Sequence, residues 1–279
     1  MTERALTFAC AGEQLVGVVS RPDAAATLGV LVIVGGPQYR VGSHRQFLLL
    51  GTRLARAGVA VMRFDYRGMG DSSGAVQTFE QSVPDIGAAL DAFRSSCPGL
   101  ERIVLWGLCD AASACLLYWE ATRDARVVGM VLLNPWVFSE DSFARTQVRH
   151  HYRRLLQRDF WKNVARGEFD VMGALRWFVS RVFTARGRPS ATTGELPFQG
   201  RMSAGMADFA GPILIVLSGG DLTAKGFIEF CEKDSEWRNL IRRPNVEQVN
   251  LPAADHTFAD TVSREKLETL NLEWLRRRF

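Results

Sequence analysis

The sequence lacks the features that mark several classes of protein. Its five cysteines form no C-x-x-C pair, and its four histidines lie in no His/Cys cluster of the kind that holds zinc. No apolar run approaches the about 20 residues of a membrane helix, and the N-terminal residues have no apolar core like that of a signal peptide. The net charge of +4 is too small to indicate nucleic-acid binding. We expect a cytoplasmic protein with reduced thiols and without a metal ion or cofactor.

What is present is an alternation of apolar strands and helices. A loosely alternating segment at 6–20 predicts an antiparallel hairpin. Beyond it, strands are expected at 29–34, 59–64, 102–106 and 127–133, and helices at 47–57, 79–95 and 111–121. Such alternation is typical of right-handed βαβ units in a parallel sheet.

The alternation stops near residue 137 and resumes at 211. The last elements are expected as strands at 211–217 and 246–251 and helices at 224–232 and 261–278. Between the two parts the sequence is helix-like, aromatic and basic. With 279 residues, the simplest organisation is one α/β core, 1–136 and 211–279, with a helical cap at 137–210 inserted into it.

Cys109 stands where a nucleophile is expected. It lies between an expected strand and an expected helix, with the small residues Gly107 and Ala111 two positions away on either side. The pattern matches the nucleophile elbow G-x-S-x-G, with Cys for Ser and Ala for the last Gly. So sharp a turn needs small neighbours, and it places the thiol at a helix N-terminus, which favours a thiolate. The other four cysteines are expected to be buried apolar side chains.

The four histidines leave a short search for the general base. Three of them lie at the start of an expected helix or in the basic middle segment: His44, His150 and His151. His256 follows the last expected strand, where parallel sheets place catalytic groups. Asp221 follows a strand and a Gly-rich turn, and taken alone it reads as an N-cap or turn residue. The order nucleophile, acid, histidine favours Asp221 as the acid, with Asp255 as a weaker candidate.

Together these features resemble the α/β-hydrolase superfamily. The stretch Asp65-Tyr-Arg-Gly-Met-Gly-Asp-Ser-Ser-Gly74 is similar to the D-x-R-G-x-G-x-S stretch after the fourth strand of that superfamily, where it organises a turn beneath the site. More narrowly, residues 34–46 and 107–113 resemble the bacterial family called exosortase A system-associated hydrolase 1. Members of that family are found beside exopolysaccharide and protein-sorting genes. The resemblance implies an α/β-hydrolase fold, with a mostly parallel sheet flanked by helices.

Two features depart from most members of the superfamily. Cys replaces Ser at the nucleophile, which is similar to the dienelactone hydrolases with their Cys–His–Asp set. Gly-Gly-Pro at 35–37 replaces the usual His-Gly, and its proline has no N–H to donate. The oxyanion hole is therefore expected to use the backbone N–H groups of Asp110 and Gln38, with Tyr39 as the alternative to Gln38. Tyr39 and Arg40 are also expected to contact the substrate.

The middle segment is strongly basic. Between residues 145 and 188 eleven Lys and Arg side chains stand against three acidic ones, an excess of eight that is twice the net charge of the whole chain. Interleaved aromatic residues give the segment apolar faces. Two interpretations stay open. The segment is a solvated amphipathic cap, or it attracts an anion, either an acyl substrate such as a CoA or carrier-protein thioester or a membrane surface to which the protein binds peripherally.

The sequence thus predicts a hydrolase of esters or thioesters with a Cys109–His256–Asp221 triad. The acyl group would pass from the substrate to the thiol of Cys109 and then to water. Since the resulting thioester must itself be hydrolysed, an acyltransferase with the same triad stays an alternative. A non-catalytic relative that serves as a scaffold in a polysaccharide-export assembly is the second alternative.

Overall fold

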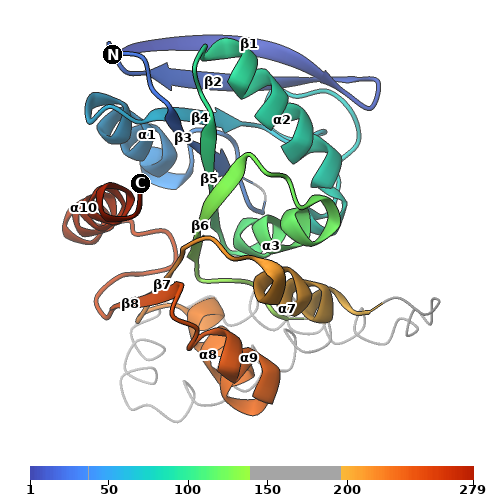
Figure 1. Ribbon diagram of the computed structural model, residues 1–279, viewed down its shortest axis with the longest axis vertical. Coiled ribbons are helices and arrows are strands. Elements are labelled where there is room, and N and C mark those ends of the chain that lie inside the picture. The colour runs from blue at the N-terminus through green and yellow to red at the C-terminus, as the bar shows by residue number, and fades with distance from the viewer. Residues whose placement is uncertain (37, 139–195) are drawn as a thin grey trace, which may run out of the picture. The chain divides into compact units, whose positions relative to one another are not determined.

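The computed structural model describes residues 1–36, 38–138 and 196–279 (Figure 1). Residues 1–137 and 196–279 form one compact unit, in which helices cover both faces of an eight-stranded sheet. The expected α/β class is therefore confirmed. Most of the expected cap at 137–210 lies outside the described residues, and its bounds stay a prediction.

The strands follow the order β1-β2-β4-β3-β5-β6-β7-β8 across the sheet. Their bounds are β1 Thr2–Cys10, β2 Glu13–Arg21, β3 Leu28–Ile33, β4 Ala60–Phe64, β5 Arg102–Leu108, β6 Val127–Leu133, β7 Ile213–Ser218 and β8 Val246–Leu251. β1 and β2 form the expected antiparallel hairpin, and β2 also pairs antiparallel with β4. All pairs from β4 to β8 are parallel.

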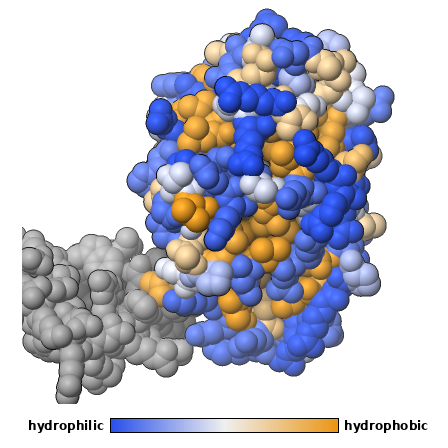
Figure 2. All heavy atoms as spheres, turned by 90° about the vertical axis from the view of Figure 1, so that its left-hand side faces the viewer, coloured by the Kyte–Doolittle hydropathy of each residue, from blue (hydrophilic) through white to orange (hydrophobic). Residues whose placement is uncertain are grey.

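The helices form a layer on each face of the sheet (Figure 1). One face carries α1 Gln46–Arg56 and α10 Thr261–Arg278, and the other carries α2 Val83–Ser96, α3 Asp110–Thr122, α7 Phe198–Asp208, α8 Leu222–Lys233 and α9 Ser235–Leu240. Two 3-10 turns are η1 Ser43–Arg45 and η2 Phe79–Gln81. Figure 2 shows the side of α1 and α10, where apolar side chains appear between polar ones.

The helix expected at 79–95 is interrupted. The short turn η2 ends at Gln81, and α2 begins at Val83 with Pro84 in its first turn. Proline has no N–H and a fixed φ, so it fits the first turn of a helix but not the interior of a longer one. The chain therefore starts a new helix at this point.

The core consists of two apolar layers, one on each face of the sheet. In β3 the side chains of Leu31 and Ile33 pack under α2 and α3, while Val30 and Val32 pack under α1 and α10. Each of these side chains is at most 1 % exposed, and each such burial is worth about 1.5–3 kcal/mol. Burial on both faces explains why the parallel strands read as continuous apolar runs.

The strand order reverses next to β3. The chain passes from β3 through α1 to β4 on one side of β3, and then through α2 to β5 on the other side. The carboxyl ends of β3 and β5 therefore lie next to each other at a switch point, where open parallel sheets bind ligands. The loops that follow β3, β5, β7 and β8 all leave the sheet at this edge, and they contain the residues expected to form the site.

Candidate active site

The turn between β5 and α3 has the conformation of a nucleophile elbow. Cys109 lies in it with φ 64° and ψ −124°, a conformation that residues other than glycine rarely adopt. A Cβ on Gly107 would lie 2.4 Å from the carbonyl oxygen of Ala111, so no larger residue fits at that position. The need for small neighbours, which the sequence predicts, has this steric cause.

The thiol of Cys109 lies in a half-buried position that opposes its ionisation. Burial raises the pKa of the Cys109 thiol, and the negative charges of Asp110 and then Asp221 raise it further. The backbone N–H of Asp110 and the hydroxyl of Thr223 act in the opposite direction but do not cancel these effects. Burial and the two carboxylates thus oppose the stabilisation that the helix N-terminus is expected to give to the thiolate form of this side chain. Its ionisation requires a base.

Asp221 and His256 come together at the ends of β7 and β8. The Nδ1 atom of His256 lies 2.9 Å from Oδ2 of Asp221, although the ring N–H does not point straight at that oxygen. Such loose alignment is common in unliganded sites. The contact with Asp221 raises the pKa of His256, burial opposes this effect, and the charges of Asp110 and Asp255 add to it. Asp221 is 6 % exposed.

The carboxylate of Asp221 has a second role in the fold. It is the N-cap of α8 and accepts hydrogen bonds from the backbone N–H groups of Thr223 and Ala224, both at 3.1 Å. The turn or N-cap reading of this residue and its contact with His256 are therefore compatible. The two cap hydrogen bonds hold the carboxylate while it also contacts the imidazole.

Asn134, at the end of β6, connects the turns that hold these two residues. Its side-chain Oδ1 accepts a hydrogen bond from the Ser218 N–H at 2.9 Å, and its Nδ2 donates to the Ser218 hydroxyl at 3.0 Å and to the His256 carbonyl at 3.5 Å. Asn134 is fully buried, and its φ of 44° is one that asparagine tolerates well. Sequence reasoning missed this residue, and its only signal was an Asn directly after a buried strand.

In the loop after β3, some backbone N–H groups are hydrogen-bonded and others are not. The N–H of Gly36 donates to the Asp110 carboxylate, and the N–H of Arg40 donates to Asp65. Among the described residues the N–H groups of Gln38 and Tyr39 have no hydrogen-bond partner. That one of these two groups, Gln38 or its alternative Tyr39, donates to an oxyanion stays a prediction.

The side chains of Tyr39 and Arg40 differ in their freedom to contact a substrate. Tyr39 is 47 % exposed. The guanidinium of Arg40 binds the buried carboxylate of Asp65 and, at 2.6 Å, that of Asp71. The turn that begins at Asp65 thus engages one donor on each terminal nitrogen of Arg40. A substrate contact of this side chain stays a prediction.

The turn after β4 is held by charged side chains within it and on α2. Asp65 accepts from the backbone N–H of Asp71 at 3.1 Å, and a Cβ on Gly70 would overlap the Asp65 carboxylate. Arg67 binds Asp85 on α2, with 2.5 Å between Nε and Oδ1. These contacts are the structural basis of the Asp65–Gly74 motif, and they place it beside the β3 loop.

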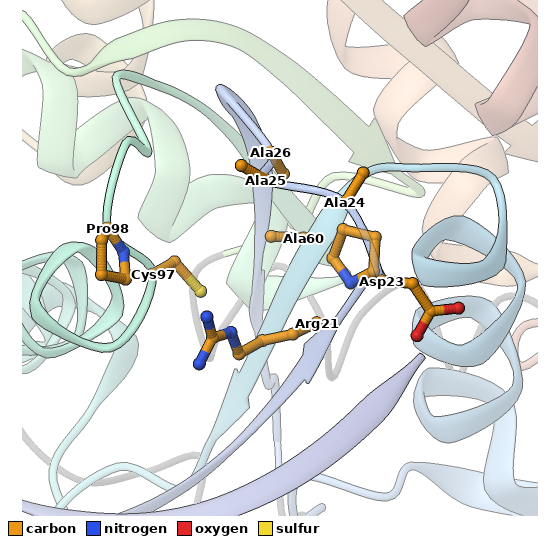
Figure 3. Close-up of a pocket in the computed structure, with 9 residues that line it drawn as sticks. Arg21, Asp23, Ala24, Ala25, Ala26, Ala60, Cys97 and Pro98 are labelled. Atoms are coloured by element: carbon orange, nitrogen blue, oxygen red, sulfur yellow. The ribbon is translucent and has the colours of Figure 1, made fainter.

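The described part of the chain also contains a cavity away from these residues. Among the described residues, no group of three His, Cys, Asp or Glu side chains is placed to hold a metal ion, and no helix is long and apolar enough to cross a membrane. The cavity, of about 260 Å³, is lined by Arg21, Cys97 and several small residues (Figure 3). It adjoins Ala60, at the amino end of β4, so it lies at the edge of the sheet opposite the nucleophile.

Comparison with known proteins agrees with the fold. The sequence model of the "Alpha/beta hydrolase family" matches residues 30–265, which is most of the chain. The chain therefore belongs to the alpha/beta hydrolase family. No curated protein sequence matches it significantly.

Several solved structures have the same fold. An esterase from Pyrococcus furiosus is 17 % identical, with a TM-score of 0.69 over 99 % of this chain and 91 % of that one. A Butyrivibrio proteoclasticus protein with bound ferulic acid is 15 % identical, with a TM-score of 0.65 over 98 % and 99 %. An alpha-beta serine hydrolase homologue from Coxiella burnetii is 18 % identical, with a TM-score of 0.61 over 99 % and 98 %. At such identity these likenesses establish the fold alone.

Proposed function

We propose that the protein hydrolyses carboxylic esters or thioesters through an acyl-enzyme on Cys109. The observation that carries this proposal is the strained elbow of Cys109 at the same sheet edge as the His256–Asp221 pair. A non-glycine residue is held in such a conformation only where the surroundings impose it, and such strain gathers at functional sites. The likeness to an esterase and to a protein that binds a carboxylic acid supports the same reaction class.

The reaction begins with transfer of the thiol proton to the imidazole of His256. The Cys109 sulfur forms a bond to the carbonyl carbon, and the oxygen that gains the electron pair accepts hydrogen bonds from the N–H groups of Asp110 and Gln38. The tetrahedral intermediate collapses, its bond to the leaving group breaks, and His256 gives its proton to that group. Water then attacks the thioester by the same steps, with His256 again as base, and releases the acid and the thiol.

The electrostatics of the site are suited to this order of events. Because burial and neighbouring carboxylates keep the thiol protonated, the base has to act at the moment of attack. Asp221 supports that base, since it favours the imidazolium that forms when the proton arrives. The negative charges around the sulfur also favour acyl groups that are neutral near the scissile bond.

A panel of p-nitrophenyl esters and acyl thioesters of increasing chain length tests the proposal. Cys109→Ala should abolish turnover, and His256→Gln should lower kcat by roughly 10³-fold or more. Intact-protein mass spectrometry after rapid acid quench should detect one acyl group. Peptide mapping after digestion should place that group on the peptide that contains Cys109. Cys97→Ser is the matched control, because this thiol lies in the remote cavity of Figure 3 and should leave turnover unchanged. Unaltered turnover in Cys109→Ala contradicts the proposal.

Acyl transfer is the second candidate reaction, and the cysteine at position 109 favours it. A thioester reacts more readily with amines and thiols than an oxygen ester does, so an acceptor could compete with water for the acyl-enzyme. Adding amine, thiol and alcohol acceptors at millimolar concentration should reveal acylated products and a faster release of the first product. Release of the free acid alone, at a rate independent of acceptor, assigns the protein to hydrolysis.

We further propose that the protein serves a bacterial exopolysaccharide and exosortase system. The support is the resemblance of residues 34–46 and 107–113 to the exosortase A system-associated hydrolase 1 family. Deleting the gene in its host should change exopolysaccharide output. Complementation with Cys109→Ala separates catalysis from a scaffold role, since a scaffold would be restored by the inactive variant.

The basic segment at 145–188 lies outside the described residues, and its proposed role rests on its charge. An anionic acyl substrate or membrane surface would be attracted by that excess of positive charge. Replacing Arg153, Arg154 and Arg158 with Gln should raise KM for CoA thioesters at low salt and leave KM for neutral esters unchanged. Equal KM values in the variant and the parent protein would contradict this role.

A further inference from the structure

The side chain of Asp110 has contacts that the reaction described above does not use. Its Oδ2 atom accepts a hydrogen bond from the Gly36 N–H at 2.9 Å, and its Oδ1 atom accepts one from the Ala111 N–H at 3.0 Å. The first of these bonds joins residues 74 positions apart in the sequence. It therefore ties the loop after β3 to the residue next to the nucleophile.

The loop is shaped to receive this carboxylate. A Cβ on Gly35 would lie 2.1 Å from Oδ1 of Asp110 and 2.6 Å from the carbonyl oxygen of Leu108. A glycine at position 35 therefore lets the loop lie directly on the Asp110 side chain. Burial raises the pKa of Asp110, and the N–H groups of Gly36 and Ala111 oppose that effect. A carboxylate in so costly a position is stabilised by the bonds it makes.

The bond to Gly36 determines which N–H groups of the loop are free. The Gly36 N–H is occupied, and residue 37 is a proline without an N–H. The next donor along the chain is the Gln38 N–H, which has no partner among the described residues. Since Gly36 precedes it by only two residues, fixing Gly36 restricts where the Gln38 N–H can point.

We propose that the Asp110 side chain is a positioning residue that anchors Gly36 and thereby holds the Gln38 N–H in the oxyanion hole. This inference rests on the proposed function of Cys109. Asp110 would then serve the site twice, with its backbone N–H as an oxyanion donor and its carboxylate as the anchor for the opposite donor. The positions of both oxyanion donors would then depend on Asp110.

Four variants separate the anchor from the charge of the side chain. Asp110→Ala removes the acceptor and should lower kcat about 100-fold while KM changes less than about threefold, because a misplaced donor affects the transition state most. Asp110→Asn keeps an oxygen that accepts the Gly36 N–H, so its kcat should stay within about fivefold of the parent protein. Asp110→Glu keeps the charge but displaces the carboxylate by one methylene, so it should resemble Asp110→Ala. The fourth variant, Asp234→Ala, is the control.

Asp234 makes comparable hydrogen bonds at a helix start away from the candidate site. Its Oδ1 atom accepts the N–H groups of Glu236 and Trp237 at 2.9 and 3.1 Å at the start of α9. Asp234→Ala should lower the denaturant midpoint of unfolding and leave kcat unchanged. This control shows how the loss of a side-chain acceptor at a helix N-terminus affects stability and kcat when the helix lies away from the candidate site.

Amide hydrogen exchange of the peptide that spans residues 34–40 gives a readout that does not depend on activity. Exchange should be faster in Asp110→Ala and Asp110→Glu, and unchanged in Asp110→Asn and Asp234→Ala. Equal exchange in all four variants, or a kcat of Asp110→Ala equal to that of Asp110→Asn, overturns the anchor. If these results occur while Cys109→Ala is inactive, the proposed function stands and only the role of Asp110 is wrong. Full turnover by Cys109→Ala overturns both.

Discussion

Oδ2 of Asp221 lies 2.9 Å from Nδ1 of His256, and the same carboxylate caps helix α8. The contact raises the pKa of His256 above the ordinary value of about 6.5. A general base works in its neutral form, so kcat/KM should rise with pH through this raised pKa and reach its plateau above it. The cap holds the carboxylate in the position from which it contacts the imidazole.

Asp221→Asn tests this relationship through the pH profile of kcat/KM. Removing the negative charge should move the acid limb to lower pH, because the imidazolium loses its main support. The plateau should fall by roughly 10³-fold, since an amide cannot stabilise the charge that forms. Asp255→Asn removes a more minor influence on the same imidazole and should produce a smaller shift in the same direction. An acid limb that does not move in Asp221→Asn would exclude this pairing.

Alkylation of Cys109 should be slow at neutral pH. Burial and the neighbouring charges of Asp110 and Asp221 raise the pKa of the thiol above the ordinary cysteine value of about 8.5. The reactive thiolate is therefore scarce at neutral pH. The rate of reaction with iodoacetamide, followed by peptide mass spectrometry, should therefore keep rising above pH 9. Asp110→Asn should shift this curve to lower pH because it removes one repelling charge. A midpoint below 8.5 in the parent protein would show that the helix N-terminus dominates instead.

The sequence predicts most of the fold because one physical pattern recurs. Strands such as β3 and β5 are buried on both faces, and this leaves continuous apolar runs that helices of clear periodicity separate. The elbow is also readable, since Gly107 is required by a clash that involves only nearby residues. Constraints between residues close in the sequence can be recognised from a short stretch of that sequence.

The parts of the site that the sequence does not predict depend on long-range contacts. Asn134 reaches Ser218, 84 residues away, and Asp110 reaches Gly36, 74 residues away. Neither contact has a spacing that a single sequence reveals. The same holds for Arg40, expected at the substrate, whose guanidinium binds two carboxylates of the following turn. The raised pKa of Cys109 also depends on the tertiary structure, because it results from burial and from the charges of Asp110 and Asp221, which lie at the starts of two different helices.

Two glycines in different settings provide a test of the steric argument for the elbow. Gly107→Ala would place a Cβ 2.4 Å from the Ala111 carbonyl oxygen, so it should lower the free energy of unfolding by about 2 kcal/mol or more and abolish turnover. Gly87→Ala in α2 would make only ordinary contacts with Tyr118, beginning at 3.8 Å. It should stabilise the protein by about 0.4–1 kcal/mol without affecting kcat. Denaturant unfolding and ester turnover measure both effects, and similar results for the two variants would contradict the steric account.

Asn134 should contribute to both stability and catalysis. Asn134→Ala leaves the buried Ser218 N–H and hydroxyl without their partner, which costs about 1–3 kcal/mol, and it places alanine at a positive φ. Because the same amide contacts the His256 carbonyl, kcat should also fall, by about tenfold or more, while KM changes little.

The control for Asn134 is Asn271, a second buried asparagine among the described residues, which lies in α10. Asn271 accepts the indole N–H of Trp106 at 2.9 Å, on the face of the sheet that carries α1 and α10. Asn271→Ala should lower the free energy of unfolding by a similar amount, about 1–3 kcal/mol, and leave kcat unchanged. The comparison is decided by kcat measured well below the unfolding transition of each variant. If both variants lose stability and neither loses kcat, Asn134 supports the fold alone, and the His256 loop is positioned by Asp221 without its help.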